Sequence, residues 1–300
     1  MAIEAEQTIL LLGGTGQIGH ELRRTLDRFG RVEAPGRDVV DLTAPASIRD
    51  AVQSLSPDLV VNAAAYTAVD EAEEEKERAA ALNVDAPRIL AEETRKVGGW
   101  FVHYSTDYVF DGTKTAPYDE TDAPNPINEY GRTKWRGEKA IRDVSDRYLL
   151  LRTSWVYSDR RSNFLLSMLR LAEENETLTV VDDQIGTPTW AGWIADATGT
   201  IVEKLLSADE PDALSGLYHL AASGQTSWYG FARAIFEQFE RPDVSVEPIS
   251  TDEYPTPARR PLYTALNSRS ACDTFELAIP TWSEQLARMR AMTAERGSLA

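Results

Sequence analysis

The chain has 300 residues, 42% of them hydrophobic and 26% charged, and its formal net charge is −17. This length suits one large domain or two smaller lobes. Because such a charge repels phosphate backbones and anionic lipid surfaces, neither nucleic acid nor a membrane is an expected partner. No apolar run approaches the ~20 residues that span a bilayer, the N-terminus lacks a signal-peptide pattern, and Cys272 is the only cysteine. The sequence therefore predicts a cytoplasmic protein without internal disulfides.

Short apolar runs alternate with amphipathic segments along the first half of the chain. Residues 113–128 are rich in proline, aspartate and asparagine and are predicted to form a loop. The alternation predicts an α/β fold, with a parallel sheet covered by helices on both faces. Strands are expected at residues 8–12, 31–34, 58–62, 100–105, 148–152 and 217–220, and helices at 16–29, 47–55, 69–97, 129–144, 164–174, 190–206 and 227–239.

Three glycines lie between the first predicted strand and the first predicted helix. Gly13, Gly16 and Gly19 are spaced by three residues, and a tight turn would be the simplest reason for them. Their position favours a dinucleotide-binding loop, in which glycines allow the turn, the approach of a pyrophosphate and close helix packing. Helix-start amides would then face the anion. The loop residues predicted to bind the cofactor are Gly13, Thr15, Gly16, Gln17, Ile18 and Gly19.

The end of the second predicted strand bears on the choice of cofactor. An NAD-binding protein usually carries an acid there for the ribose hydroxyl, but this chain has Arg37. An arginine could bind a 2′-phosphate, which favours NADPH, with NADH as the alternative and a solvated surface arginine as the simpler interpretation. Asp41 and Leu42 are expected beside the adenine. Small residues end the next strand and would lie against the dinucleotide: Asn62, Ala63, Ala64 and Ala65.

A tyrosine and a lysine stand four residues apart at the start of the predicted helix 129–144. Tyr130 and Lys134 therefore share one helix face, although such pairs also occur on ordinary helix surfaces. A lysine beside a tyrosine can lower the pKa of the phenol. Ser105 or Thr106, at the carboxyl end of a predicted strand, could aim a hydroxyl into the same crevice. Together these residues predict a site for proton transfer.

Further motifs follow in order along the chain, and with them the sequence resembles a known family. The motifs are residues 62–70 (NAAAYTAVD), 105–112 (STDYVFDG), 152–157 (RTSWVY), 182–189 (DDQIGTPT), 216–220 (GLYHL), 227–229 (SWY), 256–261 (TPARRP) and 267–269 (NSR). The set is similar to the dTDP-4-dehydrorhamnose reductases of the extended short-chain dehydrogenase/reductase superfamily. The resemblance covers nearly the whole chain.

The resemblance implies NAD(P)H-dependent reduction of the 4-keto group of dTDP-4-dehydro-L-rhamnose, giving dTDP-L-rhamnose for surface polysaccharide or glycan precursors. It implies that Tyr130 donates the proton, that Thr106 binds the reacting oxygen, and that Lys134 holds the nicotinamide ribose and lowers the tyrosine pKa. Arg260 and Arg269 would bind the diphosphate or nucleotide, where surface salt bridges are the alternative. The remaining implied sugar-pocket residues are Val69, Asp70, Asp107 and Trp155.

The resemblance also implies an architecture. It comprises a Rossmann-type dinucleotide-binding domain, residues 1–157 rejoined by about 188–221, and a smaller C-terminal α/β lobe, residues 158–187 and 222–300, for the nucleotide-sugar. Several members are described as metal-dependent homodimers that use glutamates. Glu21 matches one such position, but Gly192 stands where another acid is expected. The resemblance thus makes a homodimer possible, but the glycine at position 192 argues against a magnesium site.

Two alternative functions stay open at this level. A nucleotide-sugar epimerase or dehydratase shares the early motifs, and Asp107 beside Thr106 would suit a dehydratase. A non-catalytic regulatory subunit of the same fold would bind dinucleotide without chemistry, although an intact Thr106, Tyr130 and Lys134 argues against it.

Overall fold

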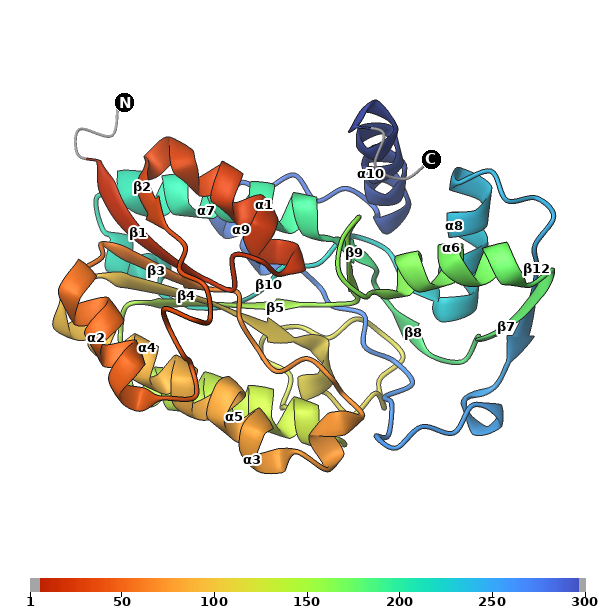
Figure 1. Ribbon diagram of the computed structural model, residues 1–300, viewed down its shortest axis with the longest axis horizontal. Coiled ribbons are helices and arrows are strands. Elements are labelled where there is room, and N and C mark those ends of the chain that lie inside the picture. Colours follow the sequence, from red (N-terminus) through yellow and green to blue (C-terminus); the bar gives the residue numbers. More distant parts are fainter. Residues whose placement is uncertain (1–5, 297–300) are drawn as a thin grey trace.

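The computed structural model describes residues 6–296, which are built around a six-stranded sheet (Figure 1). All neighbouring strands run parallel, in the order β10-β5-β4-β3-β1-β2. The central strands are almost wholly buried because both faces of the sheet are covered. The predicted Rossmann-type α/β fold is confirmed. The strands are β1 (Gln7–Leu12), β2 (Gly30–Glu33), β3 (Leu59–Asn62), β4 (Trp100–Thr106), β5 (Tyr148–Thr153) and β10 (Gly216–His219).

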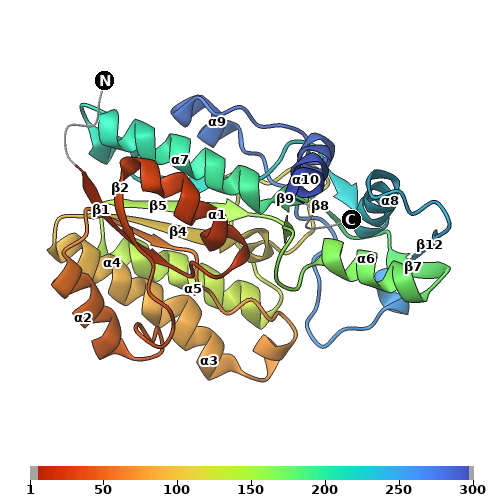
Figure 2. The same cartoon turned by 45° about the horizontal axis from the view of Figure 1, so that its top comes forward.

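Two layers of helices cover the sheet, one on each face (Figures 1 and 2). One layer comprises α1 (Gln17–Leu26), α7 (Ala191–Ser207) and α9 (Arg269–Phe275), and the other α2 (Pro45–Leu55), α4 (Ala86–Lys96) and α5 (Glu129–Val144). Leu22 and Ile194 pack into the first core, and Ile89 and Ile141 into the second. From β1 the chain passes to β2 on one side of it, and then crosses over to β3 on the other side. Crevices that bind ligands lie at such a switch point, at the carboxyl ends of the strands.

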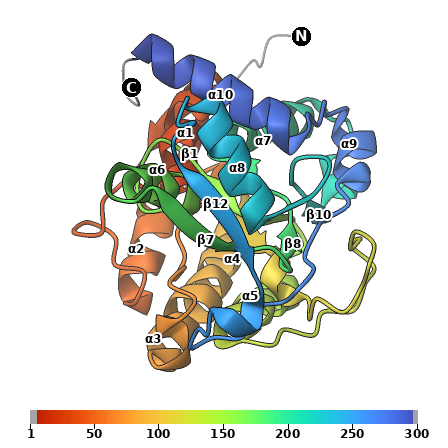
Figure 3. The ribbon, with the colours of Figure 1, turned by 90° about the vertical axis from the view of Figure 1, so that its right-hand side faces the viewer.

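A smaller group of elements lies beyond the carboxyl ends of the sheet strands and faces the viewer in Figure 3. The parallel pair β7 (Thr177–Val181) and β12 (Ser245–Ile249) packs against α8 (Trp228–Gln238), which also contacts α6 (Phe164–Glu174). The helix α10 (Trp282–Arg296) packs on β9 and α8. Four short strands join this group to the main sheet: β6 (Val156–Tyr157), β8 (Ile185–Gly186), β9 (Thr189–Trp190) and β11 (Thr226–Ser227).

The segment predicted as helical at 69–97 is interrupted rather than continuous. A 3₁₀ turn (Glu71–Glu73), α3 (Lys76–Ala80) and a π-helical turn (Ala81–Asp85) precede α4. The buried Asn83 side chain bonds the main chain of Tyr66 and the Thr133 hydroxyl, which anchors the π turn against α5. Further 3₁₀ turns are Asp27–Phe29, Asp107–Val109, Pro211–Leu214 and Thr251–Glu253.

Candidate active site

A cavity of about 550 Å³ opens at the carboxyl ends of the sheet strands. Most of the predicted site residues line it, although they come from distant parts of the sequence. They are Gly13, Thr15, Gly16, Gln17, Ile18, Arg37, Ala63, Ala64, Ala65, Thr106, Asp107, Tyr130, Lys134 and Trp155. The sequence did not single out Thr67, Tyr104, Thr153, Val156, Arg161 and Ser162, which line it too.

The glycine loop has the geometry that a dinucleotide needs. Gly13 has φ +78°, and a Cβ there would stand 2.6 Å from the Ala63 carbonyl carbon. A Cβ on Gly19 would stand 2.1 Å from the Gly13 oxygen, so this glycine allows α1 to pack closely. Helix α1 begins after Gly16 with neither a side-chain cap nor an acid in its first turn. Its free amides face the cavity and fit a pyrophosphate.

The other predicted cofactor residues divide into two groups. Arg37 lines the cavity, where its charge could meet a 2′-phosphate. Asp41, Leu42 and Asn62 lie outside the lining: Asp41 accepts hydrogen bonds from Thr43, Leu42 packs on the second core, and Asn62 is buried. Arg161 reaches the loop from far along the chain, and its Nε donates to the Thr15 carbonyl at 2.9 Å. No sequence motif marks that contact.

Thr106, Tyr130 and Lys134 meet at the floor of the cavity. The Asn128 side chain accepts from the Gly131 amide at 2.8 Å and so begins α5 at Glu129. This start places Tyr130 in the first turn, with Lys134 one turn further on. The Thr106 hydroxyl lies close enough to the Tyr130 phenol to oppose the rise of its pKa.

Burial controls the protonation of both α5 residues. It raises the pKa of Tyr130 to about 12, against the lowering that the sequence led us to expect from Lys134. Burial also lowers the pKa of Lys134 to about 8, although the Glu138 carboxylate opposes the shift. In the free protein, desolvation therefore outweighs any effect of the lysine charge on the phenol.

Lys134 has partners that the sequence did not suggest. Its Nζ donates to the Tyr104 carbonyl at 2.6 Å and stands 3.0 Å from His103 Nε2. The other ring nitrogen, His103 Nδ1, lies 3.1 Å from Asn62 Nδ2. All three side chains are at most 2% exposed.

The two hydroxyls at the end of β4 have different partners. Ser105 Oγ donates to Glu138 at 2.5 Å, and Glu138 is bound by Arg152 at 2.7 and 2.8 Å. Thr106 Oγ1 donates to Asp107 Oδ1 at 3.1 Å. Of the two residues that the sequence left open, Thr106 is therefore the one in contact with Tyr130.

Asp107 is a buried acid at the reacting end of the cavity. It is 2% exposed, and its second oxygen accepts from the Ser154 hydroxyl at 3.0 Å. Burial raises the pKa of Asp107 to about 6, while hydrogen bonds from hydroxyl groups oppose the rise. Asp107 is therefore an ionised acceptor at neutral pH.

Trp155 lines the cavity on the side of the smaller lobe, and a second tryptophan, Trp228, stacks on it. Trp155 stands at φ +46°, and its ring stacks on Trp228 with centroids 3.5 Å apart and planes 2° apart. A Cβ on Gly186 would stand 2.3 Å from the Trp155 ring, so this glycine provides the space. A flat indole face suits a sugar ring. The sequence predicted Trp155, but not its stacking partner.

The predicted substrate residues outside the cavity lining have different surroundings. Arg260 Nη2 binds Asp70 Oδ2 at 2.7 Å, and Asp70 also accepts from the Ala258 amide at 3.0 Å. Val69 is half-buried next to this pair. Arg269 is not brought to the cavity: it starts α9, which packs on β10 and α7, and its 81%-exposed side chain pairs with Asp273 one turn on.

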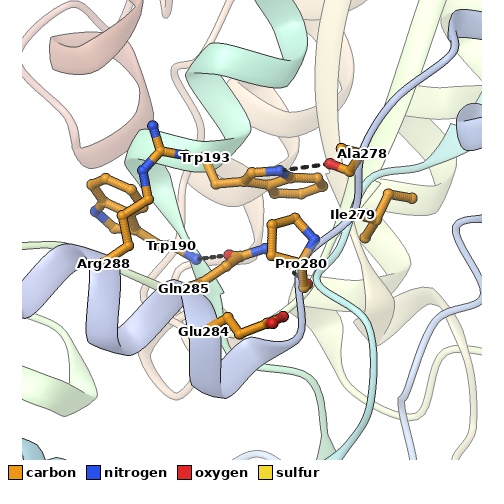
Figure 4. A pocket seen from close by; sticks show the side chains of 8 residues that line it. All are labelled: Trp190, Trp193, Ala278, Ile279, Pro280, Glu284, Gln285 and Arg288. Carbon is orange, nitrogen blue, oxygen red and sulfur yellow. Dashed lines mark hydrogen bonds between the residues drawn. The ribbon is translucent and has the colours of Figure 1, made fainter.

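A second cavity lies between α7 and α10 (Figure 4). The Trp190 amide donates to Gln285 at 3.0 Å, and the Trp193 indole N–H donates to Ala278 at 3.3 Å.

The acid that a family metal site would place at position 192 does not fit this structure. A Cβ on Gly192 would stand 2.3 Å from the Trp190 ring, so an acid would clash there. Glu21 is buried, and within residues 6–296 no group of three or more histidines, cysteines or acids could hold a metal.

This arrangement defines an oxidoreductase of the short-chain dehydrogenase/reductase type, in which a dinucleotide loop and a half-buried tyrosine line one cavity. Residues 7–294 match the RmlD substrate binding domain family. The chain belongs to this family, that of the dTDP-4-dehydrorhamnose reductases.

Two curated relatives carry the name dTDP-4-dehydrorhamnose reductase. The Burkholderia thailandensis protein is 45% identical, covering 91% of this chain and 95% of its own, and the Escherichia coli K12 protein is 43% identical, covering 94% and 96%. A solved reductase from Bacillus anthracis, in complex with NADP, has a TM-score of 0.89 and 33% identity over 96% of this chain and all of its own. A Thermus thermophilus UDP-glucose 4-epimerase has a TM-score of 0.75 at 18% identity over 95% of this chain and 99% of its own, which shows the shared fold alone.

The comparisons confirm the predicted family, the enzyme class and the nicotinamide dinucleotide as cofactor. Among the described helices, none combines the length and apolar character required to cross a membrane.

Proposed function

We propose that this enzyme reduces dTDP-4-dehydro-L-rhamnose to dTDP-L-rhamnose with NADPH, for surface polysaccharide or glycan precursors. The observation that carries the proposal is the half-buried Tyr130 phenol, which lies with Thr106 and Lys134 in the cavity onto which the glycine loop opens. Among residues 6–296, no tyrosine lines the second cavity. The preference for NADPH over NADH rests on Arg37.

The chemistry assigned to the chain is proton donation and charge stabilisation. NADPH, when bound, supplies the hydride that reduces the C4 carbonyl. Tyr130 gives its proton to the developing alkoxide, and its raised pKa keeps that proton in place at neutral pH. Thr106 donates to the same oxygen once its hydroxyl turns away from Asp107. Lys134 lies deeper than Tyr130 and is assigned to the nicotinamide ribose.

We assign sugar binding to the Trp155 face and to the junction of Asp70 with Arg260. The ion pair between them brings the 256–261 motif beside the catalytic end, where the free N–H groups of Arg260 could bind a diphosphate. Val69 and Asp107 remain assigned to the sugar pocket. Arg269 is left out of the assignment because its side chain is bound on the surface of α9.

We also propose a division of the chain into two lobes, an oligomeric state and a cellular location. The larger lobe would comprise the six-stranded sheet and its helices, including α9, and the smaller one α6, β7, α8 and β12. This division moves α9 out of the lobe predicted from residues 222–300. The outermost residues of the predicted ranges, 1–5 and 297–300, lie outside the described residues. A homodimer and a cytoplasmic location, where NADPH is available, complete the proposal.

The test is steady-state oxidation of NADPH with dTDP-4-dehydrorhamnose and with the free 4-keto sugar, together with identification of the product. The nucleotide positions the reacting carbon, so its removal should lower kcat/KM steeply. A reductase consumes one NADPH per sugar, whereas an epimerase or dehydratase consumes none overall. Absence of turnover would favour the regulatory subunit, and comparable kcat/KM for both substrates would contradict the nucleotide-sugar assignment.

A further inference from the structure

The short segment between β6 and α6, residues 158–163, lies against the glycine loop and has no role in the mechanism above. Ser158 Oγ donates to Gln17 Oε1 at 2.8 Å, which attaches the segment to the first residue of α1. Arg161 Nε donates to the Thr15 carbonyl at 2.9 Å. Arg161 and Ser162 also line the active-site cavity, together with the loop itself. A segment that leads into the smaller lobe thus reaches the dinucleotide end of the cavity.

The main chain of Arg161 is held in an unusual conformation. Its φ is +60°, in the left-handed region that side chains other than glycine rarely adopt. The Asn163 amide group holds the turn, because its Nδ2 donates to the carbonyls of Ser158 at 2.9 Å and Arg160 at 3.1 Å. Its Oδ1 accepts from the Leu166 amide at 3.2 Å and so caps α6. Strained positions of this kind persist only where their surroundings hold them, and they concentrate at ligand sites.

The charge of Arg161 has no acidic partner in the part of the chain that the structure describes. None of the ion pairs among residues 6–296 includes Arg161, whereas its neighbour Arg160 lies 4.0 Å from Asp159. The Arg161 side chain is exposed. A guanidinium has five N–H donors, and Thr15 uses only the one on Nε. Both Nη groups therefore remain able to donate to an anion in the cavity.

The wall beside Arg161 already suits an anion. Helix α1 begins after Gly16 with neither a side-chain cap nor an acid in its first turn, so its first amides are free to donate. The Thr15 carbonyl is an acceptor in the same wall, and a carbonyl oxygen repels a phosphate oxygen. By donating to that carbonyl, Arg161 covers the acceptor and adds a positive charge next to the free amides.

We propose that Arg161 is a further cofactor-binding residue, which stays on the Thr15 carbonyl through Nε and binds the pyrophosphate of the dinucleotide through its Nη groups. This inference deepens the cofactor assignment in the proposed function, and it depends on the dinucleotide but not on the sugar. Arg161 acts on phosphates that NADPH and NADH share. Arg37, in contrast, is assigned to the 2′-phosphate that only NADPH carries.

Two other roles for Arg161 lead to different behaviour. If Arg161 only ties the loop to residues 158–163, its removal should disturb the whole dinucleotide end and weaken every ligand that binds there. If Arg161 binds the 2′-phosphate instead, its removal should weaken NADPH and leave NADH unchanged. Ligands with and without a pyrophosphate therefore distinguish the three roles.

The experiment is calorimetric titration of the full chain with NADPH, NADH, ADP-ribose and adenosine 2′-monophosphate. Arg161→Gln removes the charge and keeps an unbranched side chain with a terminal donor. The first three ligands carry a pyrophosphate and should lose affinity by one common factor, roughly tenfold for a charge-assisted contact open to solvent. Adenosine 2′-monophosphate has no pyrophosphate and should bind as before. The loss should shrink as the salt concentration rises, because salt screens an exposed charge.

Two further variants control for the conformation of the main chain and for net charge. Arg161→Gly removes the charge together with the strain at φ +60°, so it should weaken the same three ligands without lowering the melting temperature. Arg170→Gln removes one positive charge from α6 at an exposed residue that does not line the cavity. It should leave all the affinities unchanged.

The results decide between the roles of Arg161. Unchanged affinity for NADH in both Arg161 variants would overturn the proposal, and so would a loss confined to NADPH. An equal loss for adenosine 2′-monophosphate would show that Arg161 only ties the loop. The titrations need no sugar, so absence of turnover with every nucleotide-sugar would contradict the proposed function and leave this test of Arg161 standing.

Discussion

The two ends of the active-site cavity are built from different parts of the chain. At the dinucleotide end, main chain and small side chains make the surface: Gly13 lies against Ala63, and the first amides of α1 are free. At the catalytic end, buried side chains satisfy one another, as in the contacts of Asp107 with Thr106 and Ser154.

The two kinds of surface differ in how sensitive their function is to substitution. A surface made of main chain tolerates most side-chain changes, except at glycines whose space is already filled. A buried network of polar side chains loses a partner with each substitution, and each loss leaves a polar group unsatisfied. We therefore expect the largest effects at the catalytic end and the smallest at the dinucleotide end.

The largest effect is expected from Tyr130→Phe, which removes the proton donor and keeps the ring. Losing a general acid typically costs ~10²- to 10⁴-fold in rate, so kcat should fall by this order while the Kd for NADPH stays nearly unchanged. Steady-state kinetics and fluorescence titration measure the two. Tyr148→Phe, at the far end of β5, is the matched control. A near-normal kcat in the Tyr130→Phe enzyme would show that Tyr130 is not the proton donor.

Asp107→Asn tests the buried charge through its dependence on pH. The folded pKa of Asp107 is about 6, against an ordinary value of 3.8. Because it is raised, the folded state binds more protons, so the contribution of Asp107 to stability is full below about pH 4 and lost as pH rises through 6. Between about pH 4 and 6, the free energy of unfolding of the asparagine variant should rise relative to that of the wild type, by at most about 3 kcal/mol.

Urea unfolding of both proteins between pH 4 and 8 measures this difference. A difference in unfolding free energy that does not change with pH would show that burial does not raise the pKa of Asp107. Any constant offset reports only the changed hydrogen bonds with Thr106 and Ser154.

Arg260→Ala tests the junction between the two ends. A charge-assisted contact to phosphate is worth ~1.5–3 kcal/mol, so KM for the nucleotide-sugar should rise roughly 10- to 100-fold. Arg269→Ala is the control, since its side chain is exposed and pairs with Asp273. A lower melting temperature with unchanged KM would mean that Arg260 only braces Asp70.

The smallest effect is expected from Arg37→Ala, at the dinucleotide end. One charge-assisted hydrogen bond contributes about 1.5 kcal/mol, which corresponds to roughly a tenfold loss of NADPH affinity. Affinity for NADH should not change, because NADH lacks the 2′-phosphate. Arg31→Ala, whose exposed side chain pairs with Glu33, is the control. Equal loss for both cofactors would contradict the assignment of Arg37.

The same contrast explains how much the sequence could predict. Strand β4 and helix α5 follow from hydrophobic pattern and capping, and the predicted range 129–144 coincides with α5. The glycine loop was predictable because its spacing reflects local main-chain geometry. Tyr130 and Lys134 were predictable because positions four residues apart share a helix face.

Contacts between distant segments were not predictable in this way. The pairing of β7 with β12 joins residues about 70 apart along the chain, and Trp155 meets Trp228 only in the folded protein. Arg269 was expected in the site because of its motif, yet its helix packs on β10 and α7, and its side chain is exposed. His103 looked like an ordinary strand residue, since a period-two pattern carries no information about its ring partners.

The Trp190 ring packs so closely on Gly192 that substitutions at these two positions depend on each other. An acid at position 192 needs space that the indole fills, so acquiring it first would be harmful, whereas shortening Trp190 first would open the route. A smaller side chain at 190 would remove this close contact, so positions 190 and 192 are coupled in this fold.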